Sequence, residues 1–347
     1  MYPADRNSML GALTGSRCMS EAVAGYLAKM KIGYFLSCEE YSPDQLLEQA
    51  ELAQEAGFDA LWISDHDHPW NDEQGESPFV WSMIGALSQL VELPVTTAVT
   101  CPIMRMGPTL VAQAAATSHV LLGGRFRLGL GTGEALNEHI HGDAWPAERV
   151  RLEMLEEAVE VIRELWKGEA VQHRGTHYTV ENARIYTRLD EPPEIYVSAF
   201  GPVAAEVAAR ISEGLITTSV DEEVIKFFEK EGKPLTGGFK VAWAPSEDEG
   251  VEHAHRLWAN SGLPGELAQV LPSPQHFAQA SKLVTKDSTR ESTVCGNDVS
   301  RHVDRFDEWI EAGFAEVYVS NMGPHYKAMI TAYGEQVLPA VREKVTA

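Results

Sequence analysis

The chain has 347 residues, 44% of them apolar, which is enough for one large domain or two smaller ones. Its 51 acidic and 28 basic residues give a formal net charge of −23, a field that repels nucleic acids and anionic lipids. No stretch approaches the roughly 18 consecutive apolar residues of a membrane-spanning helix. We therefore expect a small-molecule substrate and neither a nucleic-acid nor a membrane partner.

Residues 1–29 lack the sustained apolar segment of a secretory signal. We expect this segment to be a poorly ordered extension, followed by a single folded domain over 30–347. The four cysteines are far apart and form no CxxC pair, which predicts reduced thiols in a cytoplasmic protein.

Apolar runs of strand length alternate with amphipathic helical segments from Lys31 to the end of the chain. In "PDQLLEQAELAQEAG", for example, apolar residues repeat at helical spacing and Gly57 supplies a stop. Eight runs read as strands: "KIGYFLS" at 31, "ALWISDH" at 60, "PVTTAVT" at 94, "FRLGLGTG" at 126, "EIYVSAFG" at 194, "LITTS" at 215, "GGFKVAWAP" at 237 and "AEVYVSN" at 315.

Eight strands, each followed by a helix, predict a (β/α)8 TIM barrel. The rival fold, a doubly wound open sheet, would carry GxGxxG after its first strand, where this chain reads "SCEEYSP". Two segments exceed a minimal barrel. Residues 169–188 alternate like a hairpin, and residues 250–296 resemble a helical insertion between the seventh and eighth strands.

Titratable and aromatic residues follow the first four predicted strands. Strand one ends near Glu39, strand two in "SDHDHPW", strand three in "TTAVT" and strand four in "GTGEALNEH". Because the carboxyl ends of barrel strands meet at one mouth, we expect these side chains to surround a pocket.

Each of these residues also has a purely structural explanation. Glu134 suits a helix N-terminus, and Trp70 could close a core beneath a loop. Their occurrence at consecutive strand ends favours a pocket. His66, His68, His139 and His141 could in principle bind a metal ion, but HExxH and carboxylate-triad patterns are missing, so we expect no metal site.

The segments "SDHDHPW", "AVTCP", "GTGEALNE" and "SAFGP" together resemble the luciferase-like barrel superfamily. Within it they are similar to the branch of proteins like the F420-dependent glucose-6-phosphate dehydrogenases. The resemblance runs from Met30 over nearly the whole chain. It implies hydride chemistry with the deazaflavin coenzyme F420 on a sugar, sugar phosphate or alcohol.

The resemblance also implies roles for individual residues. By resemblance, four residues are expected to be catalytic: His66 and Trp70 match the family's catalytic histidine and tryptophan, Glu134 matches its active-site acid, and Glu39 matches the acidic residue after strand one. Residues in positions that contact the cofactor include a non-prolyl cis peptide at Ala98-Val99, and the whole set is Asp65, Ala98, Val99, Thr100, Gly131, Thr132, Gly133, Asn137, Phe200 and Gly201.

The residues expected to bind the substrate differ from those of the sugar-phosphate members of the family. These carry a phosphate-binding lysine after strand six, where this chain has Thr218, Ser219 and then Asp221. An acid there disfavours a phosphate dianion. Basic residues of the insertion remain available to bind substrate, namely Arg290, Lys282 and Lys286.

Two other functions stay open at this point. Relatives of similar pattern are thought to use FMN as monooxygenases or reductases, and a third reading is a non-catalytic flavin-binding protein. The resemblance further implies a homodimer, for which the apolar segment "SPFVWSMIGALSQL" is a candidate surface.

Overall fold

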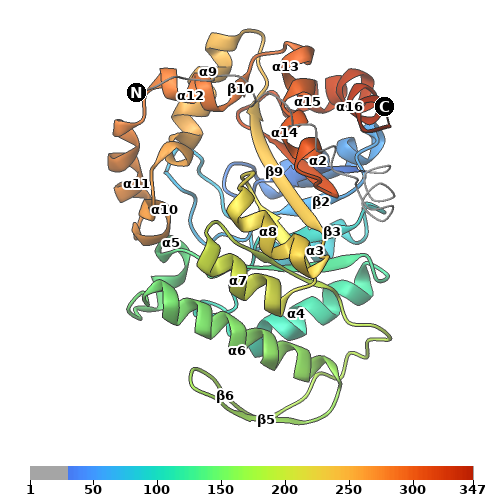
Figure 1. Cartoon of the computed structure of the whole chain (residues 1–347), viewed down its shortest axis with the longest axis vertical. Helices are drawn as coiled ribbons and strands as arrows, with labels where there is room; N and C mark the ends of the chain where they lie inside the picture. Colours follow the sequence, from blue (N-terminus) through green and yellow to red (C-terminus); the bar gives the residue numbers. More distant parts are fainter. Residues whose placement is uncertain (1–29, 347) are drawn as a thin grey trace, which may run out of the picture.

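A computed structural model describes residues 30–346 (Figure 1). Eight parallel strands pair in the order β9-β11-β1-β2-β3-β4-β7-β8, and β8 pairs with β9 to close a barrel, which confirms the predicted (β/α)8 fold. The barrel strands are β1 (Lys31–Leu36), β2 (Leu61–Ile63), β3 (Val95–Thr97), β4 (Phe126–Leu130), β7 (Ile195–Ser198), β8 (Gly214–Thr217), β9 (Leu235–Ala242) and β11 (Glu316–Asn321).

Helices follow each barrel strand and form the outer layer (Figure 1). Those before the seventh strand are α2 (Pro43–Ala56), α3 (Val80–Leu87), α4 (Pro108–Leu121), α5 (Ala135–Glu138), α6 (Glu148–Trp166), α7 (Pro202–Ile211) and α8 (Glu222–Glu231). Those of the last turn are α13 (Val299–Asp304), α14 (Asp307–Glu311), α15 (Tyr326–Ala332), the π-helical η4 (Tyr333–Val337) and α16 (Leu338–Thr346).

The first barrel helix shows how local sequence sets these boundaries. Ser42 accepts a hydrogen bond from the backbone N–H of Gln45, while the Gln45 side chain accepts one from the backbone N–H of Ser42. This reciprocal cap satisfies two N–H groups that the helix leaves free. Gly57 ends the helix at φ 87°, a left-handed conformation that glycine adopts without strain.

Two additions decorate the barrel. The strands β5 (Val171–Arg174) and β6 (Thr179–Ala183) form an antiparallel hairpin outside the barrel. Between β9 and β11 lie α9 (Glu247–Trp258), α10 (Leu267–Val270), α11 (Pro274–Ala280) and α12 (Lys286–Ser292). The sequence pattern did not reveal β10 (Val294–Cys295), whose two residues pair with the end of β9.

Aromatic side chains fill the inside of the barrel. Trp62 stacks on Tyr318 with ring centroids 4.2 Å apart, and Phe35 meets Trp62 edge-on at 5.8 Å. Ala98 and Val99 pack on this cluster but remain partly exposed. Side chains therefore fill the barrel interior, and Ala98 and Val99 form an apolar floor at the end where the strands finish. Across residues 30–346, no helix combines the length and apolar character needed to cross a bilayer.

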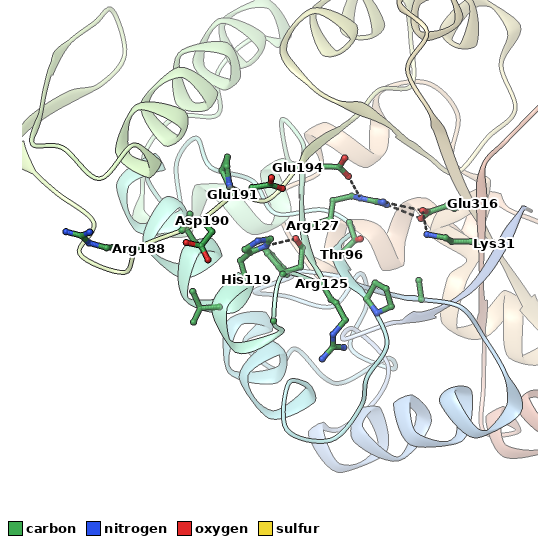
Figure 2. A pocket seen from close by; sticks show the side chains of 18 of the residues that line it. Lys31, Thr96, His119, Arg125, Arg127, Arg188, Asp190, Glu191, Glu194 and Glu316 are labelled. Carbon is green, nitrogen blue, oxygen red and sulfur yellow. Dashed lines mark hydrogen bonds and ion pairs between the residues drawn. The ribbon is translucent and has the colours of Figure 1, made fainter. Parts of the chain in front are cut away.

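A cavity of about 850 Å³ opens at the opposite end of the barrel (Figure 2). Its lining includes residues at or just before the starts of strands, where Arg127 bonds Glu316 at 3.0 Å and lies 3.4 Å from Glu194. Catalytic groups of such barrels occupy the carboxyl ends of the strands, whereas the N-terminal face serves stability. The active site is therefore expected at the other end of the barrel, where the strands end.

His302 predicts how stability depends on pH. The ring is fully buried, with Nδ1 3.0 Å from the Tyr333 hydroxyl and Nε2 3.0 Å from the Gly296 carbonyl. Burial lowers the pKa of His302 to about 4. Below pH of about 6.5 the unfolded chain binds a proton that the folded chain refuses, so stability falls as the pH drops from about 6.5 to about 4.

The expected loss of unfolding free energy across this window is about 3 kcal/mol. Urea unfolding at a series of pH values measures it. In His302→Gln the contribution should vanish, whereas His141→Gln, a change at an exposed histidine, should keep it. Identical pH profiles for wild type and His302→Gln would contradict the assignment.

Candidate active site

The loop after β2 carries His66, and Asn137 of α5 fixes its shape. The Asn137 Oδ1 accepts hydrogen bonds from the backbone N–H groups of Asp67 (2.8 Å) and His68 (2.9 Å). Its Nδ2 lies 2.9 Å from Nδ1 of His66 and also donates to Glu134. One buried amide therefore joins the tops of the second and fourth strands, as the sequence predicted for these ends.

Two carboxylates face the other nitrogen of the same ring. The His66 Nε2 lies 3.4 Å from a Glu39 oxygen and 3.9 Å from a Glu134 oxygen. Glu39 is buried and accepts a 2.7 Å hydrogen bond from Ser64. The structure thus brings together three of the four residues predicted as catalytic.

The fourth, Trp70, packs against the same histidine. The two ring centroids are 5.0 Å apart, and the Phe277 ring of α11 meets Trp70 edge-on at 5.0 Å. The 250–296 insertion therefore packs on the loop that carries His66, which sequence spacing alone did not indicate.

Lys240 is a site residue that the sequence analysis missed. It lies in β9 and donates a 2.8 Å hydrogen bond to Ser37, while its ammonium sits 3.8 Å from the Trp258 ring centroid. Burial lowers the pKa of Lys240, opposed by the carboxylates of Glu39 and Glu40. The one signal in the sequence is a lysine within an otherwise apolar barrel strand.

This lysine affects the acid beside His66. Burial disfavours the charged form of Glu39, but the charges of His66 and Lys240 and the Ser64 hydrogen bond outweigh it and lower the pKa of Glu39. Glu39 therefore carries a negative charge next to the histidine over most of the pH range in which enzymes work.

Glu40, the next residue, behaves in the opposite way. Burial raises its pKa, although Trp258 Nε1 and the Gly323 N–H both donate hydrogen bonds to its carboxylate. Glu40 thus joins the top of β1 to α9 and to the loop after β11. Its role is to hold these three segments together.

Asp65, predicted as a cofactor contact, has protein partners for both of its oxygens. Thr100 donates at 2.7 Å and Arg105 at 2.7 Å. Arg105 also lies 3.5 Å from Glu138, whose pKa is raised to about 7 because burial outweighs the arginine's charge. Arg105 and Glu138 were not predicted, because nothing in their spacing indicates an ion pair with Asp65.

The predicted cofactor floor has a shape that suits a flat ring. The cis peptide bond expected between Ala98 and Val99 is present. A Cβ at Gly131 would lie 2.7 Å from Val99 Cγ2, so only glycine lets β4 approach this floor. Gly133 adopts φ +69° in the turn after Thr132. The apolar floor and the close backbone around it fit the tricyclic ring of a deazaflavin.

The predicted phosphate position lies at the top of β7. Gly201 precedes α7, which has no side-chain cap, so the first N–H groups of this helix are free to bind an anion. A Cβ at Gly201 would meet nothing within 4 Å, and Phe200 is 52% exposed beside it. These residues fit the phosphate end of the same cofactor.

The predicted substrate residues are not gathered in the same way. Thr218 and Ser219 are exposed after β8, and Asp221 caps α8 by accepting a 2.8 Å hydrogen bond from the Glu223 N–H. The basic residues of the insertion lie on α12 or just before it: Arg290 pairs with Asp248 at 2.9 Å, Lys286 pairs with Glu252, and Lys282 is exposed.

Known proteins are similar to this chain in sequence and in fold. Residues 25–316 match the family described as luciferase-like monooxygenase. An F420-dependent glucose-6-phosphate dehydrogenase of Microbacterium testaceum is 33% identical over 332 residues, covering 91% of this chain and 98% of that protein. One from Nakamurella multipartita is 32% identical over 332 residues, covering 91% and 98%.

A solved structure extends the comparison. An F420-dependent secondary alcohol dehydrogenase in complex with an F420-acetone adduct superposes with a TM-score of 0.84 at 31% identity, over 90% of this chain and 99% of that one. The family match, the sequence identity and the superposition all relate this chain to the same group of enzymes. The chain therefore belongs to the luciferase-like family, in the branch that includes the F420-dependent glucose-6-phosphate dehydrogenases.

Proposed function

We propose that this protein is an F420-dependent dehydrogenase that oxidises a hydroxyl-bearing carbon of an uncharged alcohol. The observation that carries the proposal is the His66 ring held at one nitrogen by the Asn137 loop and facing Glu39 and Glu134 with the other. A histidine placed in this way can take the proton of a substrate hydroxyl.

Two contacts of Nδ1 correspond to the two tautomers of His66. When Nδ1 carries the proton it donates to the His68 carbonyl, 3.1 Å away, and Nε2 has a free lone pair. This tautomer accepts the hydroxyl proton as the C–H bond gives up its hydride. The resulting Nε2–H points at the Glu39 carboxylate, which is already ionised and can receive a hydrogen bond.

The cofactor contributes the hydride acceptor when bound. The floor at Ala98 and Val99 would support its ring, and the N-terminus of α7 at Gly201 would bind its phosphate. Both structural relatives and curated relatives named for F420 support this coenzyme over FMN.

The surroundings of β8 support an uncharged substrate over a sugar phosphate. Asp221 puts a carboxylate after the exposed Thr218 and Ser219, and the charge of Arg290 is balanced by Asp248 and Glu247. A phosphate dianion there would meet the acid Asp221, and the nearby acids already balance the charge of Arg290.

A binding and turnover experiment tests the function. Fluorescence titration of the purified protein with F420 and, separately, with FMN should give the tighter dissociation constant for F420. The loaded enzyme should then reduce F420 with a secondary alcohol at a higher kcat/KM than with glucose 6-phosphate. Tighter binding of FMN would contradict the assignment of F420 as the cofactor. A higher kcat/KM for glucose 6-phosphate would contradict the assignment of an uncharged alcohol as the substrate.

We also propose a homodimer in the cytoplasm. An apolar groove runs between α3 and α4, lined by Trp81, Leu110 and Leu121, and the side of α4 exposes 54% of Leu110 and 45% of Leu121. Apolar area of this kind is typical of interfaces. The buried, free thiols of Cys38, Cys101 and Cys295 suit a reducing compartment.

The double variant Leu110→Lys/Leu121→Lys should convert the dimer into a monomer, because four added charges cannot be buried across a twofold interface. Size-exclusion chromatography with light scattering measures the mass. Leu283→Lys, at an exposed leucine of the insertion, is the matched control and should leave the dimer intact. A monomeric wild type, or a dimeric double variant, would contradict the assignment.

A further inference from the structure

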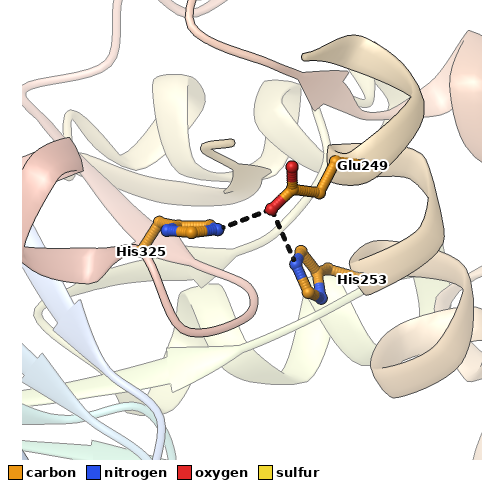
Figure 3. Close-up of side chains that lie close together, drawn as sticks. All are labelled: Glu249, His253 and His325. Atoms are coloured by element: carbon orange, nitrogen blue, oxygen red, sulfur yellow. Dashed lines mark hydrogen bonds and ion pairs between the residues drawn. The ribbon is translucent and has the colours of Figure 1, made fainter. Parts of the chain in front are cut away.

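Away from the catalytic mouth, three side chains converge on one point in the described part of the chain (Figure 3). Glu249 and His253 are one turn apart on α9, so they share a face of the helix. His325 comes from the loop that follows β11. The sequence analysis expected no metal site and weighed other histidines, because His325 lies far from α9 along the chain.

The distances between the three groups are close to those of a coordination sphere. The His325 Nε2 lies 2.9 Å and the His253 Nε2 3.7 Å from the same Glu249 oxygen, and all three ligand atoms are within 4.8 Å of one another. In a tetrahedral zinc site with bonds of about 2.0 to 2.1 Å, neighbouring ligand atoms are about 3.4 Å apart. Small side-chain rotations would bring this trio to that spacing.

The His253 ring has no hydrogen-bond partner among the described residues. Its Nδ1 is buried without a hydrogen-bond partner, and its Nε2 approaches Glu249 only to 3.7 Å. Among residues 30–346 this ring therefore makes no hydrogen bond. A largely buried imidazole without partners is costly, and a metal ion on Nε2 would give the ring one partner, although it would not reach Nδ1.

Charge and exposure favour a cation here. The other acids of the same helix have basic partners, since Glu252 pairs with Lys286 and Glu247 with Arg301. In the described ion pairs Glu249 meets only the two imidazoles. Its side chain is 41% exposed, which leaves a fourth position open to water.

We propose that Glu249, His253 and His325 bind one divalent transition-metal ion, and that Zn²⁺ is the ion they suit best. Two imidazoles and a carboxylate are a zinc ligand set, whereas Ca²⁺ and Mg²⁺ require oxygen ligands. The site does not depend on the proposed reaction, because none of its residues touches His66 or the cofactor floor.

Its position gives the ion a structural role. His253 packs against Gly323, where a Cβ would come within 3.0 Å of the ring. Gly323 and Trp258, at the end of α9, both donate hydrogen bonds to Glu40. An ion would therefore tie α9 to the loop after β11 across the segment that Glu40 already joins.

The test uses the full-length chain without a tag, stripped with EDTA and desalted. Calorimetric titration with Zn²⁺ should show one equivalent bound at micromolar or tighter Kd, and thermal unfolding should shift upward. Co²⁺ should give the intense visible bands of a tetrahedral complex. Ca²⁺ and Mg²⁺ should leave the temperature of thermal unfolding unchanged. An equal rise with these ions would mean that any divalent cation stabilises the acidic protein, and it would overturn the proposal.

Matched variants locate the ion. Glu249→Gln, His253→Gln and His325→Gln should each weaken Zn²⁺ binding by about 100-fold and abolish the Co²⁺ bands. Glu252→Gln and His255→Gln lie on the same helix outside the trio and should bind as wild type. Circular dichroism checks that each variant is folded. Absence of the one-equivalent binding in the wild type, or its persistence in the three variants, overturns the site.

Discussion

Replacing His66 with glutamine is expected to lower kcat by about 10² to 10⁴ while the protein still binds F420. Glutamine keeps a polar group near Asn137 and Glu39 but cannot accept the hydroxyl proton at any pH near neutrality. The ring is only partly exposed and packs against Trp70.

The control is His68→Gln in the same loop. The His68 ring is 40% exposed and its Nδ1 lies 3.0 Å from the Leu136 carbonyl, so it anchors the loop without facing the two carboxylates at hydrogen-bonding distance. Single-turnover reduction of F420 by a saturating alcohol measures the chemical step, and a fluorescence titration measures cofactor binding. If His66→Gln retained wild-type turnover, the proton-acceptor role would be wrong.

The variant Glu134→Gln distinguishes the role of Glu134 from that of Glu39. Glu134 accepts a hydrogen bond from Asn137 and lies 3.9 Å from the His66 Nε2. Its removal as an acid should also cut turnover by about 10² to 10⁴ with cofactor binding retained. Unchanged turnover would assign the proton chemistry to His66 and Glu39 alone.

Lys240→Met is expected to destabilise the fold and to move the pH profile of the reaction. Methionine fills the space of the lysine side chain beside Phe35 and Trp258 but leaves Glu39 and Glu40 without its charge. Removing one partner of a buried charge cluster costs about 3 to 5 kcal/mol, and the partial exposure of Lys240 reduces this to about 1 to 3 kcal/mol.

The direction of the pH effect follows from Glu39. Its pKa is lowered partly by Lys240, so the variant raises it, and the acid limb of kcat/KM should shift to higher pH. The loss of stability requires ionised carboxylates. It should therefore be largest where both Lys240 and the carboxylates are charged, and should shrink as the pH falls and the carboxylates are protonated.

Urea unfolding and kcat/KM, each measured across a pH series, test both effects. Lys226→Met, at an exposed lysine of α8, is the matched control and should change neither. Lys240→Arg restores the charge and should recover most of the wild-type profile. An unshifted acid limb in Lys240→Met would show that Lys240 does not act on Glu39.

The barrel could be predicted because apolar residues repeat with one period in strands and another in helices, and both periods can be recognised within short segments of the sequence. The sequence also predicted that His66, Glu39, Glu134 and Asn137 would meet, since each follows a barrel strand directly and strand ends converge at one mouth. These predictions needed only the order of elements and the topology.

The remaining features depend on contacts between distant segments. The Lys240 ammonium bonds Ser37 across 203 residues, and Trp258 reaches Glu40 across 218. No spacing rule connects such pairs. Asp221 shows the same limit, because it was interpreted only as an acid near a phosphate site, whereas its carboxylate also caps the helix that follows.

Residues just after β1 make contacts that decide at which stage of synthesis the active-site mouth can form. The Tyr41 hydroxyl donates to the Gly323 carbonyl, 282 residues later, and Glu40 accepts from the N–H of that same glycine. During synthesis, Tyr41 and Glu40 therefore lack these partners until the segment around Gly323 has left the ribosome. Pairings this remote form late and slowly. A product truncated before Gly323 would contain His66, Glu39 and Glu134 but could not make these contacts, so we expect it to have no dehydrogenase activity.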